Sequence, residues 1–376
     1  AVIMATSGGD VTFGTASTAG NAIINLSGDS EASFTASSTA DHCQITAQGA
    51  VSSIEPGVEL SVGDNATAGE ATFVLEGGSV TGADGTVMTF FNEGSAGNAN
   101  ITVNGGTGGG RGAQVLFQSE SDGGTASFSL SGDGKVDLSR HDPGVVTVGS
   151  IAGDGQVVLG ARALAVGSNN QSTAFSGVIQ GSGSLSKIGT GTLTLSGANT
   201  YSGGTTVSAG ALAVRNPPEA DSATGTGAVQ VNGGTLAGGG SIAGAVTLGS
   251  GSGAGAVLSP GQGASKPTRL TLESSLTFKA DASYRCRLNL KKAKNDLVTA
   301  NGATIESGAQ FNFQAVGRGR VRAGKVATVL SNTAATPISG TFANLPEGAT
   351  LEASGNTLQV SYHGGDGNDL TLTVVP

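Results

Sequence analysis

The sequence predicts an all-β protein, a parallel β-helix whose coils stack on one another. Five alternating segments recur at intervals of 21, 28, 28 and 27 residues, and each opens with a small residue: Ala22, Cys43, Ala71, Ala99 and Ala126. An apolar residue lies nine positions before each of them: Phe13, Phe34, Val62, Phe90 and Phe117. Strand side chains alternate between two faces with a period of two, so these positions predict two strands in each unit. The constant spacing of nine residues places the two strands in the same register in every unit. Repetition at this period is typical of a solenoid with a continuous apolar column.

The composition supports strands and excludes several other classes. The chain has 65 Gly among 376 residues, and only 12% of its residues are charged. Val, Ile, Leu and Phe follow too regular a pattern for a disordered chain, and glycine clusters such as SGDS and EGGS mark turns. No helical periodicity persists, and no run of 18 apolar residues is present. We therefore expect almost no helix and no transmembrane segment in this chain.

The net charge of −9 argues against nucleic acid as a partner, because phosphates would be repelled. The two cysteines lack the spacing of a metal site or a disulfide framework. Cys43 fills a slot that holds Ala in the other units, and Cys286 alternates in step with Tyr284 and Leu288. We expect both to be buried strand residues without a bridge between them.

Three regions follow one another along the chain. Residues 1–148 hold the coils with the Phe and Ala repeats. Residues 149–268 have short Gly-x-Gly corners. The segment IAGDGQVVLG recurs as IQGSGSLSKIG, with Ile151 and Ile179 again 28 residues apart. The segments AFSGVI and TYSGGTTV, at Phe175 and Tyr201, repeat in the same way. This recurrence predicts that the coil length continues. Residues 269–376 have longer alternating strands and charges at Lys291, Lys292 and Lys294, which predicts a β-rich C-terminal capping module.

The stretch GSGSLSKIGTGTLTLSGANTYSGGTTVSAGALAV resembles the passenger-associated repeat of bacterial autotransporters. The matching residues are Lys187 to Leu195, Asn199 to Thr205 and Gly210 to Val214. Residues 338–375 are similar to the segment that closes many such passengers, so the resemblance covers roughly residues 151–376. It implies a right-handed parallel β-helix that is secreted across the outer membrane, with the last coils helping to nucleate folding outside the cell. The first ten residues lack a signal-peptide pattern, so we expect a processed form or a piece of a longer chain.

Few residues suggest a catalytic or metal-binding role. His42, His141 and His363 have no partners at metal-ligand or triad spacing, and we expect His42 to face outward and Arg140–Gly144 to form a loop. Gly364, Gly365, Gly367 and Asp369 resemble one unit of a calcium β-roll. The unit occurs once and its large apolar residue comes one position early, so a plain hairpin or corner turn is favoured.

Two charged sets have simple interpretations. The acidic residues of the first coils are expected to lie mostly in turns without forming a column: Asp10, Asp29, Glu31, Asp64, Glu70, Glu76 and Asp84. The basic stretch GRGRVRAGK, Arg318 to Lys325, is expected to be a charged strand face, with a patch for anionic glycans or lipopolysaccharide as the weaker alternative.

The sequence thus predicts no catalytic, cofactor-binding or metal-binding residues and no enzyme. The expected function is that of a surface-exposed passenger or stalk of a bacterial secreted protein, acting in display, adhesion or fibre formation. Its expected partners are copies of itself or host or cell-surface molecules, at an extracellular or cell-surface location. The alternatives are a polysaccharide-active enzyme, which needs a shelf of carboxylates with a base, and a glycan-binding module, which needs exposed aromatic side chains. We expect Phe13, Phe34, Phe90 and Phe117 to point inward, which leaves few aromatic platforms outside.

Overall fold

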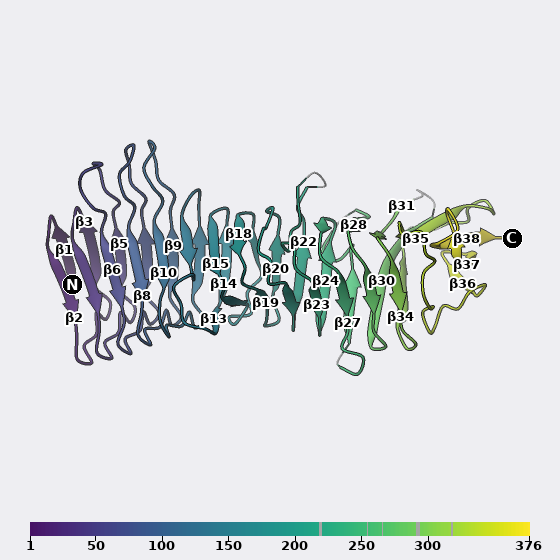
Figure 1. The fold of residues 1–376 in the computed structure, drawn as a ribbon, viewed down its shortest axis with the longest axis horizontal. Coiled ribbons are helices and arrows are strands. Elements are labelled where there is room, and N and C mark those ends of the chain that lie inside the picture. The colour runs from purple at the N-terminus through teal and green to yellow at the C-terminus, as the bar shows by residue number, and fades with distance from the viewer. Residues whose placement is uncertain (218–219, 254, 265, 291–293, 317–318) are drawn as a thin grey trace. The chain divides into compact units, whose positions relative to one another are not determined.

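The chain is all-β, and the strands of its successive coils pair in parallel (Figure 1). The computed structural model describes residues 1–217, 220–253, 255–264, 266–290, 294–316 and 319–376, and within these ranges no helix occurs. None of the described residues therefore forms a helix that could cross a membrane. The predicted parallel β-helix is confirmed. The chain divides into two compact units, Ala1–Leu193 with Asn199–Gly203 and Thr194–Ala198 with Gly204–Pro376, while β20 (Thr192–Leu195) lies at the division.

The first unit is built from three parallel sheets, each receiving one strand from successive coils. The first sheet contains β1 (Val2–Thr6), β3 (Ile23–Ser27), β5 (Gln44–Ala47), β7 (Thr72–Leu75), β9 (Asn100–Val103), β11 (Ser127–Leu130), β14 (Ser150–Gly153) and β17 (Thr173–Phe175). The second contains β2 (Asp10–Phe13), β4 (Glu31–Phe34), β6 (Glu59–Val62), β8 (Val87–Phe90), β10 (Gln114–Phe117), β12 (Lys135–Asp137), β15 (Gln156–Gly160) and β18 (Val178–Gly181). The third contains β13 (Val145–Val148), β16 (Ala163–Val166) and β19 (Leu185–Lys187).

The core of this unit consists of side chains stacked in register, as predicted. In the first sheet the buried column is Ile24, Ile45, Phe73, Ile101 and Phe128. In the second sheet Phe34, Phe90 and Phe117 are fully buried, and the rings of the last two stack with centroids 5.1 Å apart. Phe13 stacks on Phe34 at 4.7 Å but is only half-buried, because β2 pairs with a neighbour on one side only. The expectation of an inward ring is therefore met fully at Phe34, Phe90 and Phe117 and in part at Phe13.

The spread of coil lengths arises at one corner. Between the first and second sheets, short turns such as residues 28–30 and 131–134 connect the strands of some coils. In the three coils between them this connection lengthens into loops 48–58, 76–86 and 104–113, which project beyond the strand ends in the purple-to-blue part of Figure 1. These three loops together are called the fin below.

The expected continuation of the coil length beyond residue 149 is wrong. Ile151 lies in β14 beside Phe128, whereas Ile179 lies in β18 beside Val157, so the two residues belong to different sheets. The pairing of Gly153 with Phe175 makes the coil 22 residues long there. Similar Gly-x-Gly corners occur at different corners of the coil, and this places similar sequences in different sheets.

The second unit has the same three-sheet plan with longer strands toward its end. One sheet contains β22 (Ala211–Val214), β24 (Gly234–Gly238), β27 (Ala256–Ser259), β30 (Ala282–Asn289), β31 (Lys294–Asn295) and β34 (Gln310–Ala315). A second contains β21 (Thr205–Val207), β23 (Val229–Val231), β26 (Val246–Leu248), β29 (Leu276–Phe278) and β33 (Ala303–Ile305). The third contains β25 (Ser241–Ile242), β28 (Arg269–Leu272), β32 (Leu297–Ala300), β35 (Val326–Asn332), β38 (Asp369–Val375), β37 (Asn356–Gly364) and β36 (Thr350–Ala353).

In the third sheet the parallel order ends at β35, because β38, β37 and β36 continue the sheet in antiparallel pairs. In the first sheet of this unit β31 pairs antiparallel with β30. The residues after β35 also return to the core. Phe342 packs its ring 5.1 Å from Phe278 and 5.7 Å from Phe311, measured between centroids. The hydroxyl of Tyr362 accepts a hydrogen bond from the backbone N–H of Phe342 and donates one to the carbonyl of Leu345.

Candidate interaction surfaces

A ladder of side-chain oxygens fixes the corner between the second sheet and the first. Its members face one another through isolated bridges in successive coils: Thr18, Thr39, Thr67, Ser95 and Asp122. Each accepts a hydrogen bond of 2.9–3.1 Å from the backbone N–H two residues later. The donors all have positive φ, and four of the five are Gly. The corner has a sequence signal in the recurring segments TAGNA, TADHC, TAGEA, SAGNA and DGGTA, which the alternation of the strands does not reveal.

The outer side of the same corner forms an acidic groove of about 450 Å³. Carboxylates and neutral polar side chains from successive coils line it: Asp64, Asn65, Asn92, Glu93, Ser119, Glu120 and Asp142. The Nδ2 of Asn92 donates a hydrogen bond to Asp64 at 3.2 Å. Asp64, Asn65, Asn92 and Glu93 all have left-handed backbone, which turns their side chains away from the strands. Carboxylates thus do gather along this corner, but the groove lining includes no Lys, Arg or His.

The fin is held together by backbone contacts between its loops. The N–H of Ala50 donates to the carbonyl of Asp84 at 2.8 Å, and the N–H of Gly78 donates to the carbonyl of Arg111, also at 2.8 Å. Glycine is required at this contact, because a Cβ atom on Gly110 would lie 2.1 Å from the carbonyl oxygen of Gly78. The following short turn closes one side of the fin, since the carboxylate of Asp133 accepts hydrogen bonds from Gly106 and Gly112. The fin is therefore a rigid projection.

The opposite side of the fin is open and apolar. Loop 48–58 is the first of the three loops, and the coil before it has only a short turn. Ile54 is 90% exposed and Val51 is 70% exposed on this loop. Val51 and Ile54 thus form an exposed apolar patch on one loop, and contiguous patches of this kind mark contact sites.

A column of carboxylates lies beside this open side, which corrects an expectation. Asp10 of β2 pairs in register with Glu31 of β4, and Glu31 pairs with Glu59 of β6. All three side chains are exposed. The prediction that Asp10 and Glu31 belong to a scatter without columns is wrong for this pair. The missed signal is the position of each residue three places before the stacked apolar residue of its strand, Phe13, Phe34 or Val62.

The three histidines lie apart in the structure. His42 is exposed as predicted, with its ring nitrogens 3.5 Å from Asp41 and Glu70. His363 is also exposed and lies 3.5 Å from Glu347. His141 lies in the expected loop but is buried, and its ring nitrogens contact the carbonyl oxygens of Asp142 and Ser121 at 2.7 and 2.8 Å. The ring of His141 thus links two coils.

The cysteines are free and buried, as predicted. Burial, with a smaller contribution from the nearby Asp41 charge, raises the pKa of the Cys43 thiol to about 12. Burial and the charge of Asp296 also raise the pKa of Cys286. Neither thiol is therefore activated as a nucleophile at neutral pH.

The glycine-rich segment at Gly364–Asp369 forms the turn of the β37–β38 hairpin, which was the favoured interpretation. The Oδ1 atom of Asp369 accepts a hydrogen bond from the backbone N–H of Asn332 at 2.9 Å. Within the ranges that the structure describes, no three His, Cys, Asp or Glu residues are placed to hold a metal ion. The carboxylate of Asp369 therefore serves to join this hairpin to β35.

The basic stretch is not a strand face. Its described part, Gly319–Lys325, is a loop that precedes β35, and Gly317 and Arg318 lie outside the described residues, as do Lys291 and Lys292. The N–H of Val321 donates to Asn356 Oδ1 and the N–H of Gly324 donates to the carbonyl of Val374, so the loop follows the hairpin strands. Alternating glycines kept the stretch out of the ladder despite its strand-like pattern.

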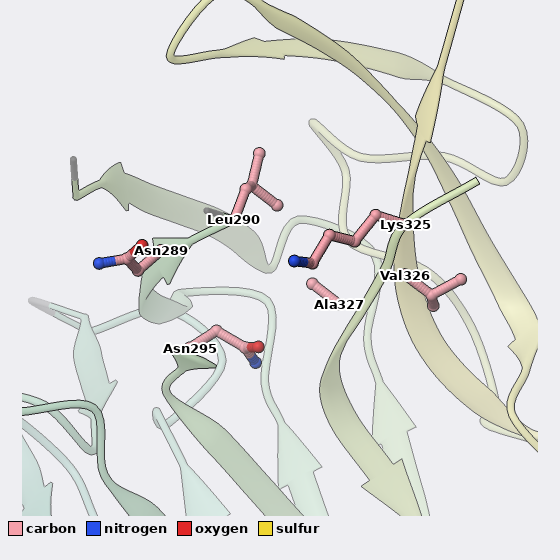
Figure 2. A pocket seen from close by; sticks show the side chains of 6 residues that line it. All are labelled: Asn289, Leu290, Asn295, Lys325, Val326 and Ala327. Carbon is pink, nitrogen blue, oxygen red and sulfur yellow. The ribbon is translucent and has the colours of Figure 1, made fainter. Parts of the chain in front are cut away.

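Lys325 borders a small cavity at the edge of the second unit (Figure 2). The cavity is lined by Asn289, Leu290, Asn295, Lys325, Val326 and Ala327. Its volume of about 10 Å³ is at the lower limit for one water molecule, so it cannot hold an organic ligand.

Two charged side chains are buried for structural reasons. Lys187 of β19 is 1% exposed and donates hydrogen bonds to the carbonyl oxygens of Ile188 and Gly189. Burial lowers the pKa of its amine. Asp296 is fully buried and pairs with Arg287 through two hydrogen bonds of 2.9 Å. Lys187 and Asp296 thus hold turns of the solenoid in place, and neither lies in a groove.

Comparison with known proteins finds the same repeat that the sequence analysis identified by resemblance. A family model described as the passenger-associated transport repeat matches residues 185–214, which include Lys187. The adhesin BmaC autotransporter of Brucella suis biovar 1 is 40% identical over 111 residues, which are 27% of this chain and 3% of that protein.

Among solved structures, the Haemophilus influenzae Hap adhesin has 10% identity and a TM-score of 0.30, over 98% of this chain and 64% of that chain. Residues 185–214 thus match a passenger-associated transport repeat, and in this repeat and over the 111 matched residues the chain is similar to autotransporter proteins.

Proposed function

We propose that the chain is a non-enzymatic, surface-exposed passenger that acts in adhesion and display. The observation that carries this proposal is the fin, a rigid projection with exposed apolar side chains at Val51 and Ile54. A projection of fixed shape lowers the entropy cost of binding, and exposed apolar area supplies binding energy. The similarity to an autotransporter adhesin supports the same function and a location at the bacterial surface or outside the cell.

The described side chains offer little for catalysis. The acidic groove has carboxylates but no basic side chain in its lining, and the thiols are buried. Glycan binding through stacking is disfavoured, because all 12 Phe and all three Tyr are buried or half-buried. Fibre formation through contacts between copies stays part of the proposal.

Adherence of coated beads tests the function. Beads carrying the purified chain are counted on cultured epithelial monolayers, beside beads carrying albumin and beads carrying the heat-unfolded chain. We expect several-fold more binding by the folded chain and competition by the soluble chain. Equal binding by albumin-coated beads would contradict adhesion. Sedimentation velocity of the soluble chain tests fibre formation, which a single monomeric species would contradict.

A polysaccharide-active enzyme is the second candidate, favoured by the carboxylates of Asp64, Glu93 and Glu120 on successive coils. Release of reducing ends from acidic and neutral polysaccharides measures this activity. Turnover that is lost in Glu93→Gln and Glu120→Gln would replace the adhesin proposal with the enzymatic one.

A further inference from the structure

The open side of the fin combines apolar and acidic groups on one face of the first unit. Val51 and Ile54 lie at the tip of loop 48–58, and Glu55 follows them directly. The loop then returns to Glu59, the first residue of β6, whose N–H donates a hydrogen bond to the carbonyl of Ser30. Together with Glu31, the register partner of Glu59, these residues are called the fin face.

The fin face carries charge that the nearby chain does not neutralise. Residues 1–110 contain 11 Asp or Glu and no Lys or Arg, whereas the whole chain has 27 acidic and 18 basic residues. The first basic residue, Arg111 in the last loop of the fin, pairs with Asp84 and not with the carboxylates of the fin face. Strands of a parallel sheet lie about 4.8 Å apart, so Glu31 and Glu59 hold like charges side by side. Like charges directly opposite one another on neighbouring strands are destabilising. Cations from a partner would relieve this repulsion.

The apolar part of the face sets the second requirement. Its two side chains project from a loop that is fixed by backbone hydrogen bonds to the next loop, such as that from Ala50 to Asp84. Both side chains therefore remain exposed in the folded chain, where a bound partner can cover them. A purely ionic ligand would leave Val51 and Ile54 in water.

We propose that the fin face binds a basic amphipathic polypeptide segment of a partner protein. Lys or Arg side chains of that segment pair with Glu31, Glu55 and Glu59, and its large apolar side chains cover Val51 and Ile54. Anionic partners are repelled by the same carboxylates. This inference rests on the proposed adhesive function and names the chemistry of its partner.

Fluorescence anisotropy with a labelled 18-residue amphipathic helix of Lys and Leu tests the proposal. Two analogues, with Lys replaced by Glu or Leu replaced by Ser, separate the ionic from the apolar requirement. We expect the Lys and Leu peptide to bind the full chain and each analogue to bind at least about tenfold more weakly. No binding of the Lys and Leu peptide overturns the proposal.

Paired variants locate the binding. The double change Val51→Ser with Ile54→Ser should weaken binding at least about fivefold, and Glu31→Gln with Glu59→Gln should weaken it and flatten its dependence on salt. Matched controls are Val145→Ser, at a position that is 55% exposed, and Glu273→Gln, also exposed; both should bind like the parent chain. Equal binding by the fin variants and the parent overturns the proposal.

Folding and function are checked separately. All changed side chains are exposed, so circular dichroism should match the parent chain. Thermal melts should also match, except that Glu31→Gln with Glu59→Gln should melt slightly higher because it removes the repulsion between paired carboxylates. If bead adherence persists in fin variants that no longer bind the peptide, the fin face is not the adhesive surface and only this inference fails. If no bead adherence occurs at all, the proposed function fails, whatever the peptide result.

Discussion

Arg287 and Asp296 form a two-pronged ion pair, in which Nε and Nη2 of the guanidinium lie 2.9 Å from Oδ2 and Oδ1 of a fully buried carboxylate. Asp296 also accepts a hydrogen bond from the N–H of Thr268. Asp296→Asn removes the charge and leaves the guanidinium poorly matched, so we expect a loss of about 3 kcal/mol in the free energy of unfolding. Urea unfolding followed by circular dichroism measures it.

An exposed pair is the control for this prediction. Lys279 and Glu306 are 2.6 Å apart, but their side chains are 36% and 38% exposed. Glu306→Gln should cost less than about 1 kcal/mol, because water screens the pair. Equal losses in the two variants would show that the buried pair has no special role.

Burial along the phenylalanine column should set the cost of truncation. Phe90→Ala removes a fully buried ring that stacks on Phe117, and we expect it to cost about 3–5 kcal/mol. Phe13→Ala should cost roughly half as much, because its ring is half-buried. Thermal melts of the two variants compare the sites directly. The stacked column would be the wrong description if Phe13→Ala were the more damaging change.

The thiols should be inert in the folded chain. Burial raises the pKa of Cys43 to about 12, so the reactive thiolate is scarce at pH 8. We expect Ellman's reagent to label neither Cys43 nor Cys286 in the native chain and to label both in urea. Rapid labelling without urea would show that a coil opens easily.

Asp281 should make stability depend on pH. Burial opposes its charge, but the N–H groups of Gly251, Gly253 and Ser250 outweigh this effect and lower the pKa of the carboxyl below its ordinary value. A lowered pKa in the folded state stabilises the fold above pH about 4, and this contribution is lost as the pH falls below that value.

Comparison with Asp281→Asn isolates this contribution. The variant should lose about 1 kcal/mol at pH 7, and the difference from the parent chain should shrink toward pH 3. Urea unfolding at pH 7, 5 and 3 measures both chains. A difference that stays constant with pH would mean that the charge of Asp281 does not matter.

The fin should depend on its glycines. Gly110→Ala places a Cβ atom 2.1 Å from the backbone of Gly78, so the loops must separate, at a cost of about 1–3 kcal/mol. Faster hydrogen exchange confined to residues 76–113 would report the separation. Gly14→Ala is the control, since its Cβ would meet only Thr35 Oγ1, at 3.8 Å. Unchanged exchange in Gly110→Ala would show that the fin is not held by this contact.

Much of the fold could be predicted because stacked strands repeat one side-chain pattern. The spacing of Ala71, Ala99 and Ala126 follows directly from the coil length. The pattern failed where similar corners occur at different places of the coil, as with Ile151 and Ile179. Alternation identifies a strand but does not say to which sheet it belongs.

The surfaces were harder to predict, because exposed residues carry no repeating apolar signal. The column of Asp10, Glu31 and Glu59 depends on register, which appears only once the strands are paired. The exposure of Ile54 depends on the absence of a long loop in the preceding coil. Neither feature is visible in a single coil.

The unequal coil lengths show how such a molecule can diversify. The strands on both sides of loop 48–58 keep their pairing with the shorter coil before them, since Glu59 still pairs with Glu31 and Ile45 with Ile24. One corner thus accepts inserted residues while the other remains fixed by its oxygen ladder. Variation in the exposed part of the molecule can therefore accumulate by local insertion, one winding at a time, without redesign of the scaffold.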